Sequence, residues 1–567
     1  MTDGRHENEH CGKGINGDEF GDGVSMKRLL YVSVLLLASS GPMLAKTFYI
    51  AASGGSDSHP GTSSKPWATF DHALGSMASG DALIVGDGTY YQAILPKARN
   101  SGTAKAYTII KAENDGKVTV DGSKVSPAPN GTLFMYGLRY IQVEGLRIAG
   151  DPTGTTGVNS IFIDGSDHIK LIRMAAYNAP CAGNVAVFTI GPGSSYVLVE
   201  DSHAWGCGRY KFLVYQSNHV ILRRNVARHD YHDNTGWPRQ ITGWGRQCAD
   251  FTSYDATDIL FQNDIAIDSG LADNSAGYLY GGLWVENNLV VDNSLEVEGS
   301  LFLNLRGLGG INDGKEGGTH TYINDVLWDT MGGLGVGYLR GVKTAPTLLV
   351  QHLTIGNISG KAQDTSHAWG VGVENGSKFS DFASQMVENS IIQQAADFGV
   401  GDYVTTDYDV FYKNKANYGI TYYEGNMPAA GAHSRTVNPQ LKYITRAEAG
   451  SPLIGAASDG GNIGATILYE IGEPGTLWGE TGYNSVTSTP LWPFPNEAAI
   501  KTDMASYKGP GPAGARGFAA PGVGLYGGPI TLTSYIWEYL GYACPASVCT
   551  TAKITSTAVS RSGEDRQ

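Results

Sequence analysis

The chain has 567 residues, and its 54 acidic and 40 basic side chains give a formal net charge of −14. This acidic balance argues against a nucleic-acid partner, because a protein that binds phosphates needs a basic surface. The 77 glycines are about twice the usual share, yet glycine and proline together stay below the level of disordered chains. With 41% hydrophobic residues, the composition predicts a folded chain with a long core and many tight turns.

The N-terminal residues have the layout of an export signal. Met26, Lys27 and Arg28 precede an apolar run at 29–38, and small residues follow up to Ala45. This pattern is typical of a signal peptide over residues 26–45, so we expect export to the medium or the cell surface, with residues 1–25 a non-native extension or disordered. The alternative is a short N-terminal membrane anchor. No other stretch reaches the ~20 apolar residues of a membrane span, and we expect a monomer.

Residues 46–120 predict an N-terminal cap and the first coils of a solenoid. Short strand-like stretches around Tyr49 and Leu83 flank an amphipathic segment at 67–77. An uncapped solenoid end would expose strand edges and core, so a strand and a short helix are expected there. This opening resembles that of secreted right-handed parallel β-helix proteins, which implies the fold but no activity.

A short phrase then recurs, in which alternating apolar residues are followed by Asn or Asp. A quasi-period of about 20 to 50 residues with strand-like alternation is typical of a solenoid whose coils bury their apolar faces against one another. We therefore predict an all-β, right-handed parallel β-helix over residues 121–465. The repeated asparagines are expected to be stacked turn residues rather than a site, and they are Asn225, Asn263, Asn287, Asn324 and Asn389.

The repeat ends before a Pro-, Gly- and Trp-rich extension at 466–549. We expect this extension to fold back over the last coils as an irregular tail with a helix at 532–540, and residues 550–567 to be disordered. Cys544 and Cys549 are expected to form a disulfide, and Cys181 and Cys207, about one coil apart, could form another.

Basic residues concentrate between positions 209 and 246, where seven occur against the two acids Asp230 and Asp233. Coils stack these positions into one patch, which would attract a polyanion such as an acidic polysaccharide. The alternative is a solvated face paired with neighbouring acids. For substrate binding we predict three arginines and two aromatic residues whose rings offer flat faces to sugars, namely Arg228, Arg239, Arg246, Trp237 and Trp244.

Carboxylates in the same region suggest a metal site. Asp230 and Asp233 lie in a connection longer than one coil, and Asp250 follows it. Oxygen ligands from adjacent coils can assemble the six to eight contacts that calcium requires. We predict these three residues as candidate Ca²⁺ ligands.

Two further stretches carry a family resemblance. The glycine-rich segment 309–318, which contains Lys315, is similar to the Gly-Phe-Lys-x-Gly-Gly segment of calcium-dependent polysaccharide lyases of family nine. The turn at 248–251 resembles the Ala-Asp-Gly-Phe turn of the same pectate lyases. The resemblance implies Lys315 as catalytic base, Asp250 in a calcium site, and Ca²⁺ as cofactor. Gly314 departs from the family, because it stands where the relatives carry an aromatic residue.

We therefore expect a polysaccharide lyase that eliminates across an acidic (uronate) sugar. Elimination needs a base for the weakly acidic C5 proton and a cation that neutralises the carboxylate. The alternative is a non-catalytic surface or matrix protein whose solenoid binds carbohydrate or another partner, because fold does not fix function.

Overall fold

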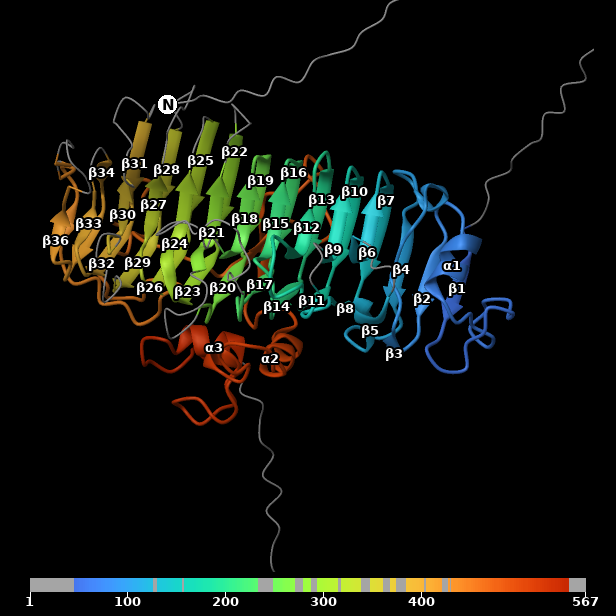
Figure 1. Ribbon diagram of the computed structural model, residues 1–567. Helices are drawn as coiled ribbons and strands as arrows, with labels where there is room; N and C mark the ends of the chain where they lie inside the picture. Colours follow the sequence, from blue (N-terminus) through green and yellow to red (C-terminus); the bar gives the residue numbers. More distant parts are fainter. Residues whose placement is uncertain are drawn as a thin grey trace, which may run out of the picture. The chain divides into compact units, whose positions relative to one another are not determined.

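The computed structural model describes residues 45–125, 130–154, 158–232, 248–270, 279–286, 293–314, 318–337, 347–359, 368–373, 384–401, 404–420, 427–428 and 430–549. Strands dominate these ranges, and they stack in three long parallel sheets that form a solenoid (Figure 1). The predicted signal peptide before residue 45 and the tail from residue 550 lie outside the described residues. None of the helices in the described ranges is long and apolar enough to cross a membrane.

Most coils contribute one strand to each sheet, and the coils at the two ends contribute fewer. Sheet 1 has thirteen strands: β1 (Thr47–Ile50), β2 (Ala82–Val85), β4 (Thr108–Ala112), β7 (Arg139–Glu144), β10 (Asp167–Ile172), β13 (Ser195–Glu200), β16 (Asn218–Arg223), β19 (Thr257–Gln262), β22 (Asn293–Glu298), β25 (Gly318–Ile323), β28 (Thr347–Gln351), β31 (Ser384–Glu388) and β34 (Thr405–Asp407).

Sheet 2 also has thirteen strands: β3 (Gly88–Tyr90), β5 (Val118–Asp121), β8 (Leu146–Ala149), β11 (Ala175–Tyr177), β14 (His203–Trp205), β17 (Val226–Ala227), β20 (Ile265–Ile267), β23 (Leu301–Leu305), β26 (Val326–Thr330), β29 (Thr354–Ile358), β32 (Ile391–Ala395), β35 (Val410–Tyr412) and β37 (Arg435–Thr436).

Sheet 3 has eleven strands: β6 (Gly131–Tyr136), β9 (Asn159–Asp164), β12 (Ala186–Ile190), β15 (Tyr210–Tyr215), β18 (Cys248–Tyr254), β21 (Leu279–Glu286), β24 (Gly307–Gly314), β27 (Leu334–Gly337), β30 (Val371–Val373), β33 (Phe398–Val400) and β36 (Ala416–Tyr418). The three sheets confirm the predicted right-handed parallel β-helix. The helix α1 (Phe70–Ser76) buries Phe70 and Leu74 at the N-terminal end and supplies the expected cap.

The core follows from the period-two alternation of the strands. In β13, Val197 and Val199 point inward and join the continuous core, whereas Leu198 points outward. Val220 and Leu222 of β16, the Cα partners of Val197 and Val199, repeat this pattern on the next coil. Because neighbouring parallel strands lie about 4.8 Å apart, each coil buries its apolar face only against the next one.

The turn from sheet 1 to sheet 2 has two residues in most coils, and its first residue adopts a left-handed conformation. The φ angle is 53° at Asn263, 61° at Asn324 and 58° at Asn389. Asn tolerates this region better than most residues do. The structure thus confirms these three asparagines as turn residues, while Asn225 occupies the second turn position and Asn287 lies outside the described residues.

The second residue of this turn points inward and binds the preceding coil. The side-chain oxygen of Asn225 accepts the Ser202 N–H at 3.1 Å, and Asp264 Oδ1 accepts the Asn225 N–H at 2.7 Å. The Ser300 hydroxyl then accepts the Asp264 N–H at 3.1 Å, and Asp325 Oδ1 accepts the Ser300 N–H at 2.7 Å. This polar turn ladder satisfies backbone donors that the sheets leave unpaired.

Three aspartates of the ladder lie in an apolar interior, where burial raises their pKa values. For Asp264 the pKa rises to about 8, and for Asp325 and Asp409 it rises well above the ordinary value. In each of them Oδ2 is buried without a hydrogen-bond partner among the described residues. Burial in apolar surroundings favours the protonated form of these carboxyls. The residues at equivalent turn positions, such as Asn225 and Ser300, are neutral as well.

This protonation makes stability depend on pH. The folded state holds the Asp264 proton up to about pH 8, whereas an unfolded Asp releases it near pH ~3.9. The stabilisation is complete below about pH 4 and is lost as pH rises to about 8. We predict that Asp264→Asn, which imitates Asn225, flattens this decline by up to about 1.4 kcal/mol per pH unit.

Urea denaturation of the mature chain at several pH values across this window measures the slope. The exposed Asp71→Asn is the matched control and should leave it unchanged. An Asp264→Asn variant that loses stability with pH as steeply as the wild type would contradict the protonated ladder.

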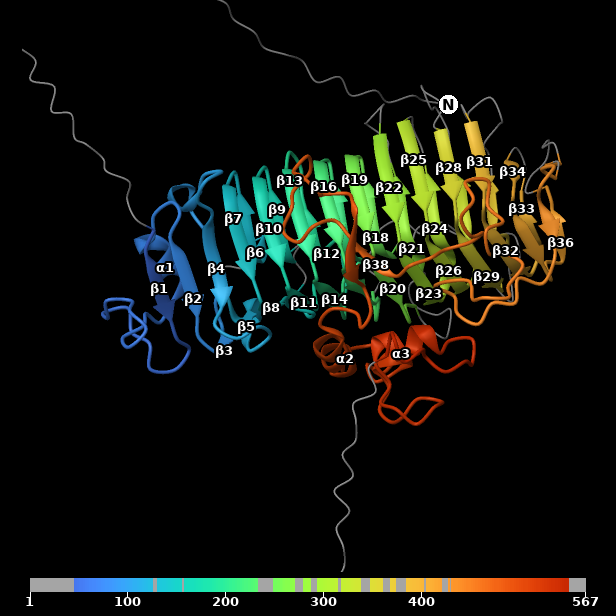
Figure 2. The ribbon, with the colours of Figure 1, turned by 180° about the vertical axis from the view of Figure 1, so that it is seen from behind.

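The C-terminal segment, residues 466–549, folds back onto two of the three sheets. Leu477 packs against Leu198, Ile221 and Leu260 on the outer face of sheet 1, next to the hairpin of β38 (Tyr469–Ile471) and β39 (Val486–Pro490) (Figure 2). Two helices, α2 (Glu497–Ala505) and α3 (Leu532–Trp537), cover the outer face of sheet 2 and bury residues such as Trp205. The predicted helix at 532–540 is thus present but ends earlier, and α2 was not predicted.

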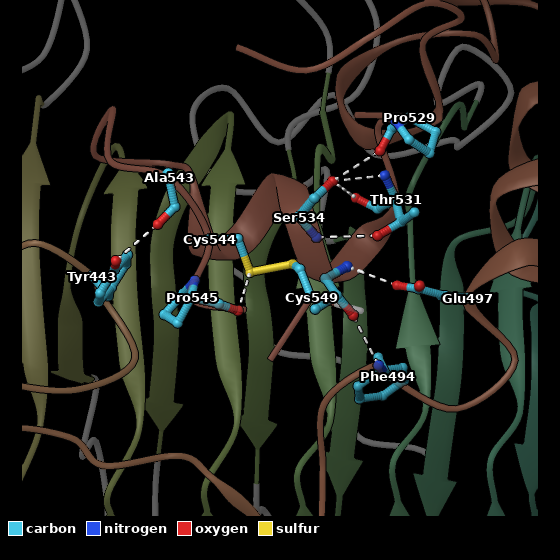
Figure 3. The surroundings of a disulfide bond; sticks show 11 residues. Tyr443, Phe494, Glu497, Pro529, Thr531, Ser534, Ala543, Cys544, Pro545 and Cys549 are labelled. Carbon is cyan, nitrogen blue, oxygen red and sulfur yellow. Dashed lines mark hydrogen bonds between the residues drawn. A yellow bond between two sulfur atoms is a disulfide. The ribbon is translucent and has the colours of Figure 1, made fainter. Parts of the chain in front are cut away.

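Two disulfides confirm the expected cysteine pairs. Cys181 is joined to Cys207, and Cys544 to Cys549. The second bridge closes the turn after α3, where the Tyr443 hydroxyl donates to the Ala543 carbonyl at 2.8 Å (Figure 3). The end of the described chain is thereby fixed to residues that follow the last coil.

Candidate functional site

The connections of the solenoid differ in length from corner to corner. Turns between sheets 1 and 2 are short in every coil, whereas β17 ends at Ala227 and β18 begins only at Cys248, and β29 ends at Ile358 before β30 begins at Val371. The long connections therefore enter or leave sheet 3. Binding groups concentrate on variable connections held by a rigid scaffold, which favours this side of the solenoid as the functional one.

The outer face of sheet 3 carries aromatic side chains on several coils. Phe134 and Tyr136 alternate with core residues of β6, and Tyr136 is 69% exposed. The ring of Phe134 lies 5.5 Å from that of Phe162 on the next coil. Further along, the Tyr254 ring lies 5.4 Å from Tyr215 and 5.8 Å from Trp284. We call these six aromatic residues, together with Asp164 beside Phe162 on the same face, the sheet 3 surface. Within it, Tyr136 is exposed and Trp284 is buried.

The C-terminal segment leaves this face uncovered in the part of the chain that the structure describes. Its packing and hydrogen bonds reach the outer faces of sheets 1 and 2 and the corner before sheet 3. Flat rings with an apolar face and a polar tip suit ligands that are apolar on one side and wet on the other. Burial raises the pKa of the Asp164 carboxyl, which stands beside Tyr136 in register.

A buried charged cluster lies at the corner where sheet 3 begins. Lys211 of β15 and Asp250 of β18 are adjacent in register and fully buried. The Lys211 ammonium donates to the Gly208 carbonyl at 3.0 Å, and the Ser269 hydroxyl donates to Asp250 Oδ1 at 3.0 Å. Burial lowers the pKa of Lys211 and raises the pKa of Asp250, although each opposes the shift of the other.

Asp230 joins this cluster to the C-terminal segment. Its Oδ2 accepts the Gly206 N–H at 2.7 Å, and its Oδ1 lies 3.0 Å from Arg228 Nε and accepts a 2.6 Å hydrogen bond from Arg516. The Arg228 guanidinium also donates to the Gly514 and Met504 carbonyls at 2.9 and 2.6 Å. One carboxylate therefore bridges two arginines from distant parts of the chain.

The expected solvent exposure of the basic patch at positions 209–246 is wrong for four of its seven basic residues. Lys211, Arg223, Arg224 and Arg228 are buried, the last three beneath the C-terminal segment. Arg223, for example, donates to the Glu473 and Tyr483 carbonyls at 2.7 Å each. Unpaired buried charges are costly, so these cations bind their own chain, where acids and carbonyls compensate them.

The predicted site residues divide into two groups. Asp230, Asp250 and Arg228 come together with Lys211 in the buried cluster. The other predicted residues lie outside the described residues, and their roles stay predictions: Lys315, Arg239, Arg246, Trp237, Trp244 and Asp233. Lys211 and Arg516 belong to the cluster but were not predicted as site residues; the excess of bases near 209 was the signal for Lys211, and nothing in the sequence pointed to Arg516.

The described carboxylates of the cluster do not fit a calcium ion. Both oxygens of Asp230 already accept hydrogen bonds, and the Lys211 ammonium stands beside Asp250 as a competing cation. Calcium requires six to eight oxygen ligands. No group of three or more potential metal ligands occurs within the described ranges. The predicted role of Asp230 and Asp250 as metal ligands therefore finds no support in this arrangement.

The role of Asp230 in compensating the buried positive charge can be tested by substitution. Asp230→Asn removes the one negative charge that Arg228 and Arg516 share. We predict a loss of about 3–5 kcal/mol of unfolding free energy, because it leaves buried positive charge uncompensated. Chemical denaturation measures the loss. Asp115→Asn, which breaks a half-exposed pair with Arg173, should cost no more than about 1 kcal/mol, and equal effects of both variants would contradict the assignment.

Comparison with known proteins finds distant structural likenesses. No protein-family model matches the chain, and no curated protein matches it. Among solved structures, the chain is similar to the pectate lyase Pel9A, with 16% identity and a TM-score of 0.39 over 74% of this chain and 95% of that one. It is also similar to the A-module of the mannuronan C-5 epimerase AlgE6 of Azotobacter vinelandii, with 14% identity and a TM-score of 0.41 over 65% and 93%.

A third similar structure is a complex of XylC with xylose, with 10% identity and a TM-score of 0.42 over 70% of this chain and 87% of that one. At such identities the likeness concerns the fold alone. The chain is a right-handed parallel β-helix protein that distantly resembles polysaccharide lyases in architecture.

Proposed function

We propose that the protein is exported and acts on an acidic polysaccharide, which it binds along the sheet 3 surface. The aromatic rows on that face carry the proposal. The rings lie on the outer face of β6 and β9 and again of β15, β18 and β21, and the C-terminal segment packs on the two other sheets. The long connections at both edges of sheet 3 support the same face. The proteins named in the comparison act on or bind sugars, which agrees with this choice of ligand.

The reaction that we propose is β-elimination on a uronate. The C5–H bond breaks and the proton passes to a base, for which the family resemblance suggests Lys315. The electron pair forms the C4–C5 double bond, and the bond from C4 to the glycosidic oxygen breaks. That oxygen takes a proton from water or an acid. A cation near the uronate carboxylate would stabilise the charge that develops at C5.

Activity is tested by the ultraviolet absorbance of the unsaturated uronate that elimination produces. Polygalacturonate and alginate are the substrates, each with and without a calcium chelator. We predict that the wild type forms the product, that Lys315→Ala reduces the rate at least about 100-fold, as expected for loss of a general base, and that the exposed Lys111→Ala leaves the rate unchanged. Equal rates for both variants would exclude Lys315 as the base.

Binding to the sheet 3 surface is tested separately. Tyr136→Ala should weaken polysaccharide binding by about 1 kcal/mol, the worth of one aromatic contact, without changing stability, because the ring is 69% exposed. Affinity electrophoresis in gels that contain the polysaccharide measures this effect. Tyr526→Ala, another exposed tyrosine on the C-terminal segment, is the control, and equal mobility of both variants would contradict the assignment.

A non-catalytic binding protein is the second candidate. The burial of Arg228, Asp230 and Asp250 favours it, because these predicted site residues contact their own chain. Retention in the polysaccharide gels together with no unsaturated product from either substrate would select this function over the lyase.

A further inference from the structure

A pocket of about 220 Å³ opens where the C-terminal segment meets the end of sheet 2. One wall comes from the solenoid and includes Ser269, Asn304 and Arg306, and the other comes from the C-terminal segment and includes Arg516 and Gly517. The volume is below the ~300–1,000 Å³ typical of sites for drug-sized ligands. An occupant is therefore limited to a group of about the size of one sugar ring.

Glycine permits the close approach of the two walls. Gly517 has a φ angle of 54°, and a Cβ atom there would lie 1.7 Å from Asp268 Oδ2. The segment can therefore lie directly against the Asp268 carboxylate only because residue 517 has no side chain. On the solenoid side, a Cβ atom at Gly270 would lie 2.7 Å from the Arg306 carbonyl oxygen.

The acid at the base of the pocket is already satisfied. Asp268 Oδ1 accepts hydrogen bonds from Asn304 at 2.6 Å and from the Tyr535 hydroxyl at 3.0 Å, and Oδ2 accepts the Phe518 N–H at 2.9 Å. Arg516 is satisfied as well, because it binds Asp230 and donates to the Asp268 carbonyl at 3.1 Å. Asp268 and Arg516 therefore line the pocket, but their polar atoms are already paired within the protein.

Arg306 differs from these groups. It is exposed at the pocket, and it forms no ion pair with any described residue. The other bases of this corner each lie close to a carboxylate: Lys211 and Arg228, which are buried, and Arg516, which is partly buried, have Asp230, Asp250 and Asp268 around them. Arg306 is thus an uncompensated cation beside polar groups that are held rigidly in place.

We propose that this pocket binds the carboxylate of a ligand about the size of one sugar ring, with Arg306 as the partner of the carboxylate. A guanidinium presents parallel N–H donors that match the two oxygens of a carboxylate. The C-terminal segment is then part of a binding site, since it supplies one wall. The choice of a uronate as probe rests on the proposed function, but the pocket does not depend on catalysis.

Calorimetric titration of the full mature chain with galacturonate tests the proposal, and galactose, which has the same ring without the carboxylate, is the matched ligand. We expect saturable binding of galacturonate and none of galactose. Arg306→Ala should weaken binding at least tenfold and Arg306→Lys should restore part of it, whereas the exposed Arg435→Ala should leave it unchanged.

Absence of galacturonate binding, equal affinity for galactose, or equal effects of Arg306→Ala and Arg435→Ala would overturn the proposal. The outcome is separable from that of the proposed function. Binding of galacturonate with no retention in polysaccharide gels would leave the pocket standing and reject the sheet 3 surface. Tighter binding of trigalacturonate than of the monomer would identify the end of a polysaccharide chain, rather than a free sugar, as the ligand.

Discussion

The two-residue turn between sheets 1 and 2 is the constraint on which the rest of the molecule depends. Its first residue is left-handed, as at Asn263, and its second side chain points inward and holds a backbone N–H of the preceding coil, as Asp264 does for Asn225. A shift of one residue would turn every core side chain to the outer face. The turn ladder therefore fixes the register in which all three sheets stack, and it does so with neutral groups in an interior that disfavours charge.

Fixed register brings distant residues together at the corner before sheet 3. Lys211 meets Asp250 because β15 and β18 pair, and Asp230 meets Arg516, which follows it by 286 residues. The resulting charges compensate one another inside the protein, so they stabilise the attachment of the C-terminal segment rather than attract a ligand. The segment in turn packs on the outer faces of sheets 1 and 2, and among the described residues it makes no such contact with the aromatic face of sheet 3.

The sequence predicted the repeating part of the structure well, because the apolar alternation and the turn asparagines are local signals that the stacking of coils reinforces. It failed where partners are remote. The basic residues near Arg223 predicted a ligand-binding patch, but their partners are remote in the sequence. Arg223 binds Glu473, 250 residues downstream, and Arg228 binds Met504, 276 residues downstream. Helix α2 was not predicted because it lacks a local start signal. The residue before it, Asn496, has a left-handed conformation, and its side chain does not cap the helix. The candidate pocket required the docked C-terminal segment, which no periodicity reveals.

We propose that an acidic polysaccharide lies along the outer face of sheet 3. A crystal structure of the mature chain with a bound oligogalacturonate tests it most directly. We expect sugar rings over Phe134 and Phe162 on neighbouring coils and over Tyr254 further along the sheet. An oligosaccharide bound on the outer face of sheet 1 or sheet 2, with the sheet 3 surface bare, would contradict it.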